Sequence, residues 1–362
     1  MKKISIFCSS FKLGGVERAL INLANSFVEQ GHEVTFIVST DDGILRNELN
    51  ERIKIVNLGC EKLRHSFYKL YCHLKVTDAE YLISGPTYPN IIALICNIFS
   101  FNRTKIIVTQ HSFQDVEMKS LGLVGRLAPV LIKLFYNRAY KVVAVSNGVK
   151  LDLIENYKIR TEKIEVIYNA VLQKSFYQNS NLPIDKSIEF KLPSNRYLVA
   201  VGRLELVKNY KFLIETYAKL KNDFPNFNLD LVILGDGTQR ESLAGQISDL
   251  KMNKHIHLLG AASNPLPIIK KAKLLLHVSL SESMGMVYVE ALALNVPILT
   301  TTNNGAIEVL EGISQKVILD EYNYEEFNQN ILKMTKYCDF GNPPDLSKFS
   351  ADVISKSFLS LM

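Results

Sequence analysis

The segment that decides the fold is residues 274–302, which read LLLHVSLSESMGMVYVEALALNVPILTTT. Its two ends, residues 274–278 and 297–302, are short apolar runs of the kind that form buried strands. Between them stand a polar loop and a short helical pattern that carries Glu290. A strand–loop–helix–strand unit predicts parallel pairing, and it places the loop at the carboxyl edge of the sheet, where open α/β folds bind ligands.

The loop and the helix after it hold two carboxylates, Glu282 and Glu290, eight residues apart, with Gly285 between them. Carboxylates accept hydrogen bonds from sugar hydroxyl groups, and the N–H groups of a helix start receive phosphate. The combination indicates a polyhydroxylated anion such as a nucleotide sugar. Two glutamates with a glycine between them are also common outside binding sites, so the interpretation depends on the rest of the chain.

Apolar strands and helical patterns alternate through almost the whole chain, which predicts a parallel α/β fold. Residues 172–196 interrupt the alternation with Asn, Ser, Pro and mixed charge, as a crossing between domains does. We therefore predict two doubly wound, Rossmann-like domains facing a central cleft, residues 1–172 and 173–345. A terminal helix within residues 346–362 is expected to pack back on the first domain.

The predicted elements can be given by residue range. The strands are residues 4–8, 33–38, 53–58, 81–84, 105–109, 142–145, 164–167, 197–201, 230–234, 256–259, 274–278 and 297–302. The helices include residues 15–30, 90–99, 122–140, 211–221, 240–251, 265–270 and 350–362.

Size and composition indicate a globular chain. With 362 residues, 47% of them apolar and 22% charged, it is large enough for two hydrophobic cores. No apolar run reaches the roughly 18 residues of a membrane span, and the start of the chain lacks the apolar region of a secretory signal. Five cysteines without CxxC spacing indicate neither a disulfide framework nor a zinc site, so a cytoplasmic location is the default.

Charge is divided unevenly along the chain. Residues 1–175 carry 23 Lys and Arg against 16 Asp and Glu, whereas the remainder carries 19 against 20. A basic N-terminal half can face an anionic membrane or a phosphate-bearing acceptor, and an ordinary basic surface is the alternative. The apolar residues 121–135 can dip into a membrane surface or form a core-facing helix. Nucleic acid is not indicated, because no basic run is interleaved with aromatic residues.

Arg203 and Lys208 follow a predicted strand of the second half and precede a helix. A guanidinium gives a forked contact and an ammonium a compact charge, so together they suit a pyrophosphate; a solvated loop is the alternative. The chain has no Asp-x-Asp pair, which metal-dependent sugar transferases commonly use. We therefore expect no metal, with the leaving phosphate neutralised by these cations and by helix dipoles.

Two features of the first half also belong to the candidate site. Gly14 and Gly15 stand after the first strand at the start of a helix, where a ligand can approach the backbone at the positive end of the helix dipole. His111 stands at the end of a predicted strand and suits a cleft; a histidine bonded to a loop carbonyl is the alternative. The GxGxxG fingerprint is complete neither here nor at residues 235–237, which counts against a dinucleotide cofactor.

Taken in order, these residues resemble family 4 of the retaining glycosyltransferases, which have the GT-B fold. The matching positions are residues 14–17, His111, Ser146, residues 168–171, 201–204, 208–209, 235–237, 259–260, 282–290 and 304–305, and Glu308. The chain departs from the family at Met284, where phenylalanine is frequent, and at Asn304, where glycine is usual. It also has Asn295 in place of a frequent glycine, and asparagine is the next best residue for a left-handed backbone.

The resemblance implies a role for the matched side chains. Arg203 and Lys208 would hold the pyrophosphate of the donor, while Glu290 would bond its ribose hydroxyls. Glu282 would meet a hydroxyl of the donor sugar, and His111 would lie beside the transferred sugar. We predict His111, Glu282, Arg203 and Lys208 as the catalytic residues.

The resemblance also implies backbone contacts with the donor. The loop at Gly14 and Gly15 would close on it, and the stretch after Gly260 would lie near the base. N–H groups that help to hold the sugar and phosphates would come from Ser283, Met284, Gly285 and Met286.

The implied reaction moves a sugar from a nucleoside diphosphate sugar to an acceptor hydroxyl with the anomeric configuration retained. No cofactor is implied, and a UDP-sugar is favoured over a GDP-sugar as donor. The basic first half favours a lipid-linked oligosaccharide acceptor, at the inner face of the membrane, in bacterial surface-polysaccharide, O-antigen, capsule or lipopolysaccharide synthesis. The alternatives are a nucleotide-sugar epimerase or phosphorylase of the same fold, and a non-catalytic nucleotide-sugar-binding subunit.

Overall fold

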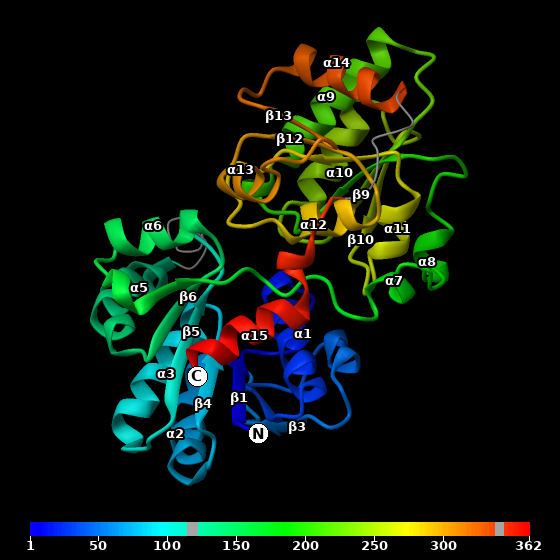
Figure 1. The fold of residues 1–362 in the computed structure, drawn as a ribbon. Coiled ribbons are helices and arrows are strands. Elements are labelled where there is room, and N and C mark those ends of the chain that lie inside the picture. The colour runs from blue at the N-terminus through cyan, green and yellow to red at the C-terminus, as the bar shows by residue number, and fades with distance from the viewer. Residues whose placement is uncertain (114–121, 337–343) are drawn as a thin grey trace. The chain divides into compact units, whose positions relative to one another are not determined.

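The computed structural model describes residues 1–113, 122–336 and 344–362, apart from the side chains of residues 122–126. The chain divides into two compact units, each treated by itself below. Unit 1 is Met1–Gln173 with Ser347–Met362, and unit 2 is Lys174–Leu346. Each unit is built on one parallel sheet with helices packed on it, which confirms the predicted α/β class (Figure 1).

The sheet of unit 1 has, among its described residues, seven parallel strands in the order β3-β2-β1-β4-β5-β6-β7. The strands are β1 (Lys3–Cys8), β2 (Glu33–Val38), β3 (Lys54–Asn57), β4 (Tyr81–Ser84), β5 (Lys105–Gln110), β6 (Lys141–Ala144) and β7 (Ile164–Val166). The helices described are α1 (Gly15–Glu29), α2 (Ser66–Val76), α3 (Thr87–Ser100), α5 (Gly122–Phe135), α6 (Asn147–Glu155) and α15 (Ala351–Leu361).

The sheet of unit 2 has six parallel strands, counted over its described residues, in the order β10-β9-β8-β11-β12-β13. The strands are β8 (Leu198–Val201), β9 (Leu231–Leu234), β10 (Ile256–Gly260), β11 (Leu274–His277), β12 (Ile298–Thr301) and β13 (Lys316–Leu319). The helices described are α7 (Phe176–Asn179), α8 (Lys186–Glu189), α9 (Tyr210–Asp223), α10 (Arg240–Asp249), α11 (Leu266–Lys271), α12 (Met286–Ala293), α13 (Asn304–Val309) and α14 (Tyr324–Lys336).

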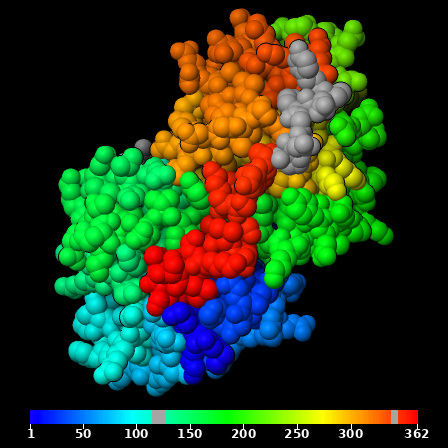
Figure 2. Space-filling model, viewed as in Figure 1, coloured from blue at the N-terminus to red at the C-terminus, as the bar shows by residue number. Residues whose placement is uncertain are grey.

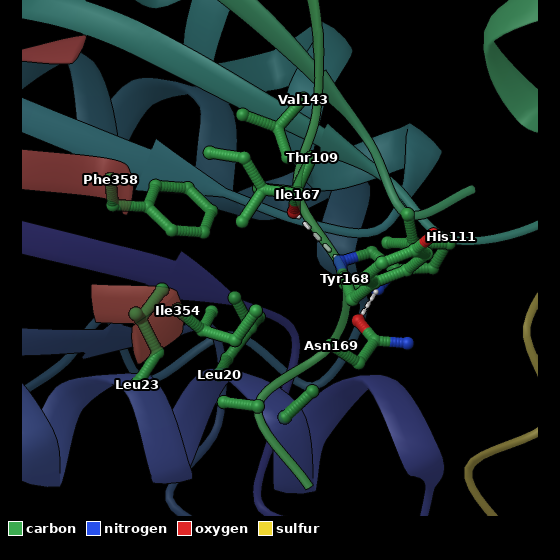
Figure 3. A pocket seen from close by; sticks show the side chains of 13 residues that line it. Leu20, Leu23, Thr109, His111, Val143, Ile167, Tyr168, Asn169, Ile354 and Phe358 are labelled. Atoms are coloured by element: carbon green, nitrogen blue, oxygen red, sulfur yellow. Dashed lines mark hydrogen bonds between the residues drawn. The ribbon is translucent and has the colours of Figure 1, made fainter. Parts of the chain in front are cut away.

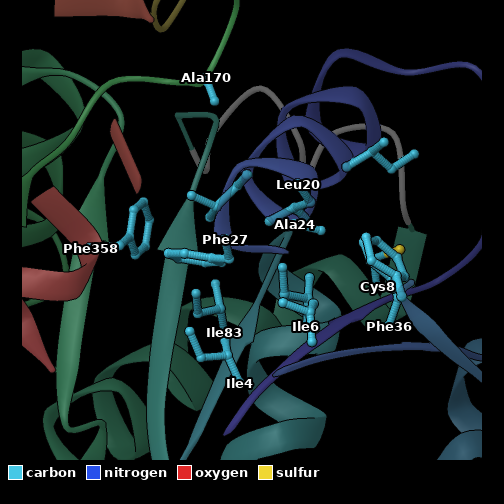
Figure 4. Close-up of a cluster of buried hydrophobic side chains, with 14 of the residues drawn as sticks. Ile4, Ile6, Cys8, Leu20, Ala24, Phe27, Phe36, Ile83, Ala170 and Phe358 are labelled. Atoms are coloured by element: carbon cyan, nitrogen blue, oxygen red, sulfur yellow. The ribbon is translucent and has the colours of Figure 1, made fainter. Parts of the chain in front are cut away.

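The core of unit 1 follows from the two periodicities of its elements. Alternate residues of β1, such as Ile4 and Ile6, point to one face of the sheet, and the apolar stripe of α1 with Leu20 and Phe27 covers them (Figure 4). Phe358 of α15 adds its ring edge-on to Phe27, with the ring centroids 6.5 Å apart. These residues are almost fully buried, so the terminal helix shares the core of unit 1.

Polar contacts also join the C-terminal residues, α15 and Met362, to the rest of unit 1. Ser355 of α15 and Ser26 of α1 join their buried hydroxyl oxygens at 2.8 Å. The ammonium of Lys2 donates to the carbonyl oxygen of Met362 at 3.2 Å. Figure 2 shows the red surface of the last residues beside the blue surface of the first ones. The terminal helix therefore packs on the first part of the chain.

The predicted elements differ from the observed ones in several places. Helices α2, α6 and α14 are not among the predicted ones, and α3 begins at Thr87 and not at Asn90. The expected helix over residues 122–140 ends at Phe135, and a 3-10 turn, Tyr136–Arg138, follows it. Strand β13 was not predicted at all, because KVIL is only four residues long and stands after a polar segment. Residue 121 of the apolar segment 121–135 lies outside the described residues.

The strand order indicates where a ligand would bind. Connections leave in opposite directions from β1 and β4 in unit 1, and from β8 and β11 in unit 2. In open parallel sheets, ligands bind outside the carboxyl ends of strands at such a switch point. In unit 2 the loops at that point are residues 202–209 and 278–285, which contain six of the nine site residues predicted in that unit.

Candidate functional site

Lys208 is brought to the switch point by the loop after β8. The loop passes through a 3-10 turn, Leu206–Lys208, and then through Asn209, whose φ of 52° lies in the left-handed region. Asparagine tolerates this backbone better than other non-glycine residues do. The turn directs Lys208 toward the loop after β11, and α9 begins directly after it.

Glu282 is the partner of Lys208. The Lys208 ammonium donates a hydrogen bond to Glu282 Oε2, and the two side chains are only 18% and 16% exposed. Nε2 of His277, at the end of β11, lies 3.3 Å from the same carboxylate oxygen. Burial alone would raise the pKa of Glu282, but the Lys208 charge and the His277 contact outweigh it and hold that pKa well below its ordinary value. Glu282 is therefore a charged carboxylate at neutral pH.

His277 and Tyr288 also belong to this cluster, and neither is among the site residues predicted from the sequence. His277 Nδ1 lies 2.8 Å from the Tyr288 hydroxyl oxygen, and both side chains are buried. The available signal was a histidine inside the apolar run 274–278, at the carboxyl end of its strand. The apolar run alone predicts a plain buried strand there, because the partner of His277, Tyr288, stands eleven residues further along the chain.

Gly285 shapes the loop that carries Glu282. Its φ is 72°, and a Cβ atom at this position would lie 2.5 Å from the ring of Tyr288 and 3.1 Å from Cγ of Glu282. Only glycine combines this left-handed backbone with such close neighbours. Gly285 is also the N-cap residue of α12, directly before its first residue.

Gly285→Ala is expected to lower the free energy of unfolding by at least about 1 kcal/mol, because alanine is strained in the left-handed region and its Cβ displaces Tyr288. Urea titration measures the change. Gly245→Ala is the matched control, since Gly245 lies inside α10 with no neighbour within 4 Å of a built Cβ. Alanine there should stabilise by about 0.5–1 kcal/mol. Equal effects of the two variants would contradict the role given to Gly285.

The loop after β11 is held against the start of α13. The N–H of Gly305 donates to the carbonyl oxygen of Glu282 at 2.9 Å. A Cβ on Gly305 would lie 2.9 Å from the backbone of Met284, so glycine is needed for this approach. Met284 and Ser283 lie in the same loop, and Met284 is 1% exposed, as expected of an apolar residue in place of phenylalanine.

Glu290, Gly260 and Asn295 are further predicted residues of unit 2. Glu290 lies in α12, which starts at Met286, and its side chain is buried. Gly260 ends β10 with a φ of 86°, and its carbonyl oxygen accepts a hydrogen bond from the N–H of Gly235. Asn295, after α12, has a φ of 57°, which confirms the left-handed backbone predicted for it.

Arg203 differs from the other predicted residues. It follows β8 directly, and its side chain is exposed. The guanidinium makes no hydrogen bond or ion pair with another residue in the part of the chain that the structure describes. The structure therefore brings together Lys208 and Glu282, and it leaves Arg203 in solvent at the same edge of the sheet.

His111 lies in unit 1 at the end of β5, and it is 8% exposed. Its Nδ1 is 2.9 Å from Asn169 Oδ1, and its Nε2 is 2.8 Å from Thr109 Oγ1 (Figure 3). Both of these ring contacts are with side chains. Burial lowers the pKa of His111 to about 4, so the ring is neutral at physiological pH.

A small, mostly apolar cavity lies beside His111 (Figure 3). It is lined by Leu20 and Leu23 of α1, by Ile354 and Phe358 of α15, and by Tyr168. The predicted glycines stand at the start of the same helix, because Gly14 is the extended N-cap residue and Gly15 is the first residue of α1.

Two expectations from the sequence concern membrane spans and metal sites. No described helix has the length and apolar content to cross a membrane. No group of three or more His, Cys, Asp or Glu side chains that could hold a metal ion occurs within residues 1–113, 122–336 and 344–362. The predicted metal-independent reaction stays a prediction.

Two family models match the chain. The model described as "Glycosyltransferase Family 4" matches residues 13–172, and the model described as "Glycosyl transferases group 1" matches residues 184–337. Together they cover most of both units.

Named proteins also resemble the chain. It is 28% identical over 338 residues to the N-acetylgalactosamine-N,N'-diacetylbacillosaminyl-diphospho-undecaprenol 4-alpha-N-acetylgalactosaminyltransferase of Campylobacter jejuni, a match that covers 90% of this chain and 87% of that protein. It is 24% identical over 309 residues to the O-antigen biosynthesis glycosyltransferase WclY of Escherichia coli, covering 83% and 80% of the two.

Solved structures share the fold. Alr3699/HepE of Anabaena, crystallised with UDP-glucose, matches with a TM-score of 0.78 and 19% identity, over 99% of both chains. WaaG, a glycosyltransferase involved in lipopolysaccharide biosynthesis, matches with a TM-score of 0.68 and 15% identity, over 99% of this chain and 95% of that one. These matches confirm the predicted GT-B fold.

Proposed function

Because the chain belongs to family 4 of the glycosyltransferases, we propose that it moves a sugar from a nucleoside diphosphate sugar to an acceptor hydroxyl with the anomeric configuration retained. The observation that carries the proposal is the buried Lys208–Glu282 pair at the switch point of unit 2. A cation at that place suits the diphosphate of such a donor, and a carboxylate suits the hydroxyl groups of its sugar.

The proposed roles follow from charge. Lys208 and Arg203 stabilise the negative charge that grows on the leaving diphosphate as the bond to the sugar breaks. Glu282 accepts a hydrogen bond from a sugar hydroxyl, since its low pKa keeps it ionised and excludes it as a general acid. Glu290 bonds the ribose of the donor, and the roles proposed for Gly260 and His111 are those implied by the family resemblance.

The donor and acceptor can be proposed more narrowly. A UDP-sugar is supported by the complex of the Anabaena relative with UDP-glucose. A lipid-linked acceptor is supported by the Campylobacter relative, whose name specifies an undecaprenol-diphosphate-linked glycan. We therefore propose an enzyme that extends such a glycan in the synthesis of a bacterial surface polysaccharide, O-antigen, capsule or lipopolysaccharide.

An apolar face of α5 in unit 1 supports association with the anionic inner surface of the membrane. Leu127, Val130 and Leu134 recur at helical spacing and are 61%, 54% and 58% exposed, while Ala128 and Ile132 are buried. The surplus of Lys and Arg within residues 1–175 provides attraction to an anionic surface. An amphipathic helix on a basic unit is the arrangement that binds membrane interfaces.

The Val130→Asp, Leu134→Asp double variant is expected to reduce binding to vesicles of phosphatidylglycerol and phosphatidylcholine by roughly tenfold or more, because it places charge on an apolar contact. Cosedimentation measures the bound fraction. The control is Leu182→Asp in unit 2, another exposed leucine, which should bind as the unchanged protein does. Unchanged binding of the double variant would remove α5 from the proposal.

The proposed reaction is tested with the purified chain, a panel of UDP- and GDP-sugars, and an undecaprenyl-diphosphate-linked acceptor. We expect one UDP-sugar to raise the melting temperature, because a ligand that binds the folded state stabilises it. That donor should release UDP only when the acceptor is present. Conversion of the donor without acceptor would favour the epimerase, and donor binding without turnover over a broad acceptor set would favour the non-catalytic subunit.

A further inference from the structure

A chain of buried hydrogen bonds leads from Glu282 into the interior of unit 2. Nε2 of His277 lies 3.3 Å from Glu282 Oε2, and Nδ1 of the same ring lies 2.8 Å from the hydroxyl oxygen of Tyr288. That hydroxyl lies 3.1 Å from Nδ2 of Asn303 and 3.1 Å from Oγ1 of Thr300. The four inner side chains are at most 6% exposed and come from β11, α12, β12 and the residue before α13.

The orientation of the Asn303 amide is fixed by the start of α13. The N–H of Ala306 donates to Asn303 Oδ1 at 2.8 Å and so fixes which side of the amide carries the oxygen. Asn303 Nδ2, which has only protons to give, therefore donates to the Tyr288 oxygen. The Tyr288 hydroxyl can then donate to Nδ1 of His277, the shortest of its contacts.

The contact with Glu282 favours the same direction. Nε2 of His277 lies 3.3 Å from Glu282 Oε2 and 3.4 Å from Oγ of Ser279. Glu282 is a carboxylate and can only accept, so a hydrogen bond between it and His277 places the ring proton on Nε2. The alternative tautomer would aim the lone pair of Nε2 at the carboxylate charge. Burial lowers the pKa of His277 and raises that of Tyr288, so both stay uncharged at neutral pH. The chain thus transmits orientation and no net charge.

The start of α13 holds both the end of the hydrogen-bond chain and the loop that carries Glu282. Asn303 caps α13, and the N–H of Gly305 in that helix binds the carbonyl oxygen of Glu282. Both the backbone and the side chain of Glu282 are therefore held by the start of α13. Lys208 meets the carboxylate from another loop, and in the proposed reaction it also meets the donor diphosphate.

We propose that His277 and Tyr288 are positioning residues that hold the Glu282 carboxylate in place for the donor sugar. The inference rests on the proposed function, in which Glu282 accepts a hydrogen bond from that sugar. Because Lys208 takes a second partner when the diphosphate binds, the His277 contact keeps Glu282 aimed while the charge of Lys208 is shared.

The test is Tyr288→Phe, which removes the hydroxyl and keeps the ring beside His277, where the centroids are 4.8 Å apart. We expect kcat for transfer from UDP-N-acetylgalactosamine, or from whichever UDP-sugar of the panel is active, to fall roughly three- to tenfold, as loss of one hydrogen bond allows. The affinity for UDP alone, which lacks the transferred sugar, should not change. The matched control is Tyr217→Phe, a buried tyrosine of α9 that donates to Leu229 in the same unit and should leave kcat unchanged.

A double-mutant cycle separates positioning from stability. In a Glu282→Ala background, Tyr288→Phe should lower kcat less than about twofold, because the carboxylate that it positions is absent. A full and independent loss in that background would overturn the proposal. So would a loss of the same size in Tyr217→Phe. His277→Leu should reduce kcat more than His277→Gln, since glutamine retains an N–H that can donate to Glu282.

A second measurement needs no donor and so separates the inference from the proposed function. Nitrogen-15 NMR of the labelled protein, with the His277 signals assigned by their loss in His277→Gln, should show a proton on Nε2 and none on Nδ1. A predominant proton on Nδ1 would contradict the proposed direction of the hydrogen bonds, and with it the positioning role, even if transfer is observed. Absence of transfer from every donor, with the expected proton on Nε2, would instead overturn the proposed function and with it the positioning role.

Discussion

Lys208→Ala is expected to reduce kcat by roughly 10²–10³-fold, which corresponds to about 2.7–4 kcal/mol in the barrier, because it removes a preorganised charge from the leaving diphosphate. Steady-state kinetics with the active UDP-sugar measure the loss. The fold should survive with lowered stability, since Lys208 lies on a loop outside the hydrophobic core and its loss leaves the buried Glu282 without a counter-charge.

Two further variants test whether the loss of kcat comes from the charge of Lys208. Lys208→Gln can still donate a hydrogen bond to Glu282 but carries no charge, so it should resemble Lys208→Ala in kcat. It should also be less stable than the unchanged protein, because the buried Glu282 loses its counter-charge. Lys211→Ala, an exposed lysine three residues further on, should leave kcat unaltered. Turnover near the normal rate in Lys208→Ala would refute its role.

The second large effect concerns stability and pH. The pKa of Glu282 in the folded protein lies below its ordinary value of 4.5, so above pH 4.5 this carboxylate contributes its full stabilisation. As the pH falls below 4.5, the unfolded chain takes up the proton first, and the contribution declines. Glu282→Gln should therefore be less stable than the unchanged protein at pH 7 by roughly 1.5–3 kcal/mol, the usual worth of hydrogen bonds to a charged group.

The difference between the two proteins should shrink on acidification. Urea titrations at pH 7, 5 and 3.5 provide the measurement. Glu241→Gln, an exposed glutamate of α10, is the control and should differ little from the unchanged protein at each pH. A difference for Glu282→Gln that stays constant down to pH 3.5 would contradict a lowered pKa.

Much of the sheet architecture could be predicted from local pattern. The bounds predicted for β2 and β4 are the observed ones, because their apolar runs are closed on both sides by polar or turn-forming residues. The meeting of Lys208 and Glu282, 74 residues apart, followed from one rule: carboxyl ends of neighbouring parallel strands share an edge.

The remaining features depend on contacts that the pattern does not encode. His277 was read as one residue of an apolar strand, because its meaning comes from Tyr288 and Asn303, which approach only in the folded unit. The side-chain partners of His111 could not be foreseen either, since Asn169 stands 58 residues away. Strand β13 is too short to have a periodicity of its own.

The way in which α15 completes unit 1 has a practical consequence. The N–H groups of Val171 and Leu172 both bind the carbonyl oxygen of Phe349, so the points where the chain leaves unit 1 and returns to it are neighbours. Unit 2 can accordingly be excised and replaced by a few Gly and Ser residues without stretching the backbone. Deleting only the tail would instead uncover the ring of Phe27, so an expression plasmid for the amino-terminal half should encode the last sixteen residues as well.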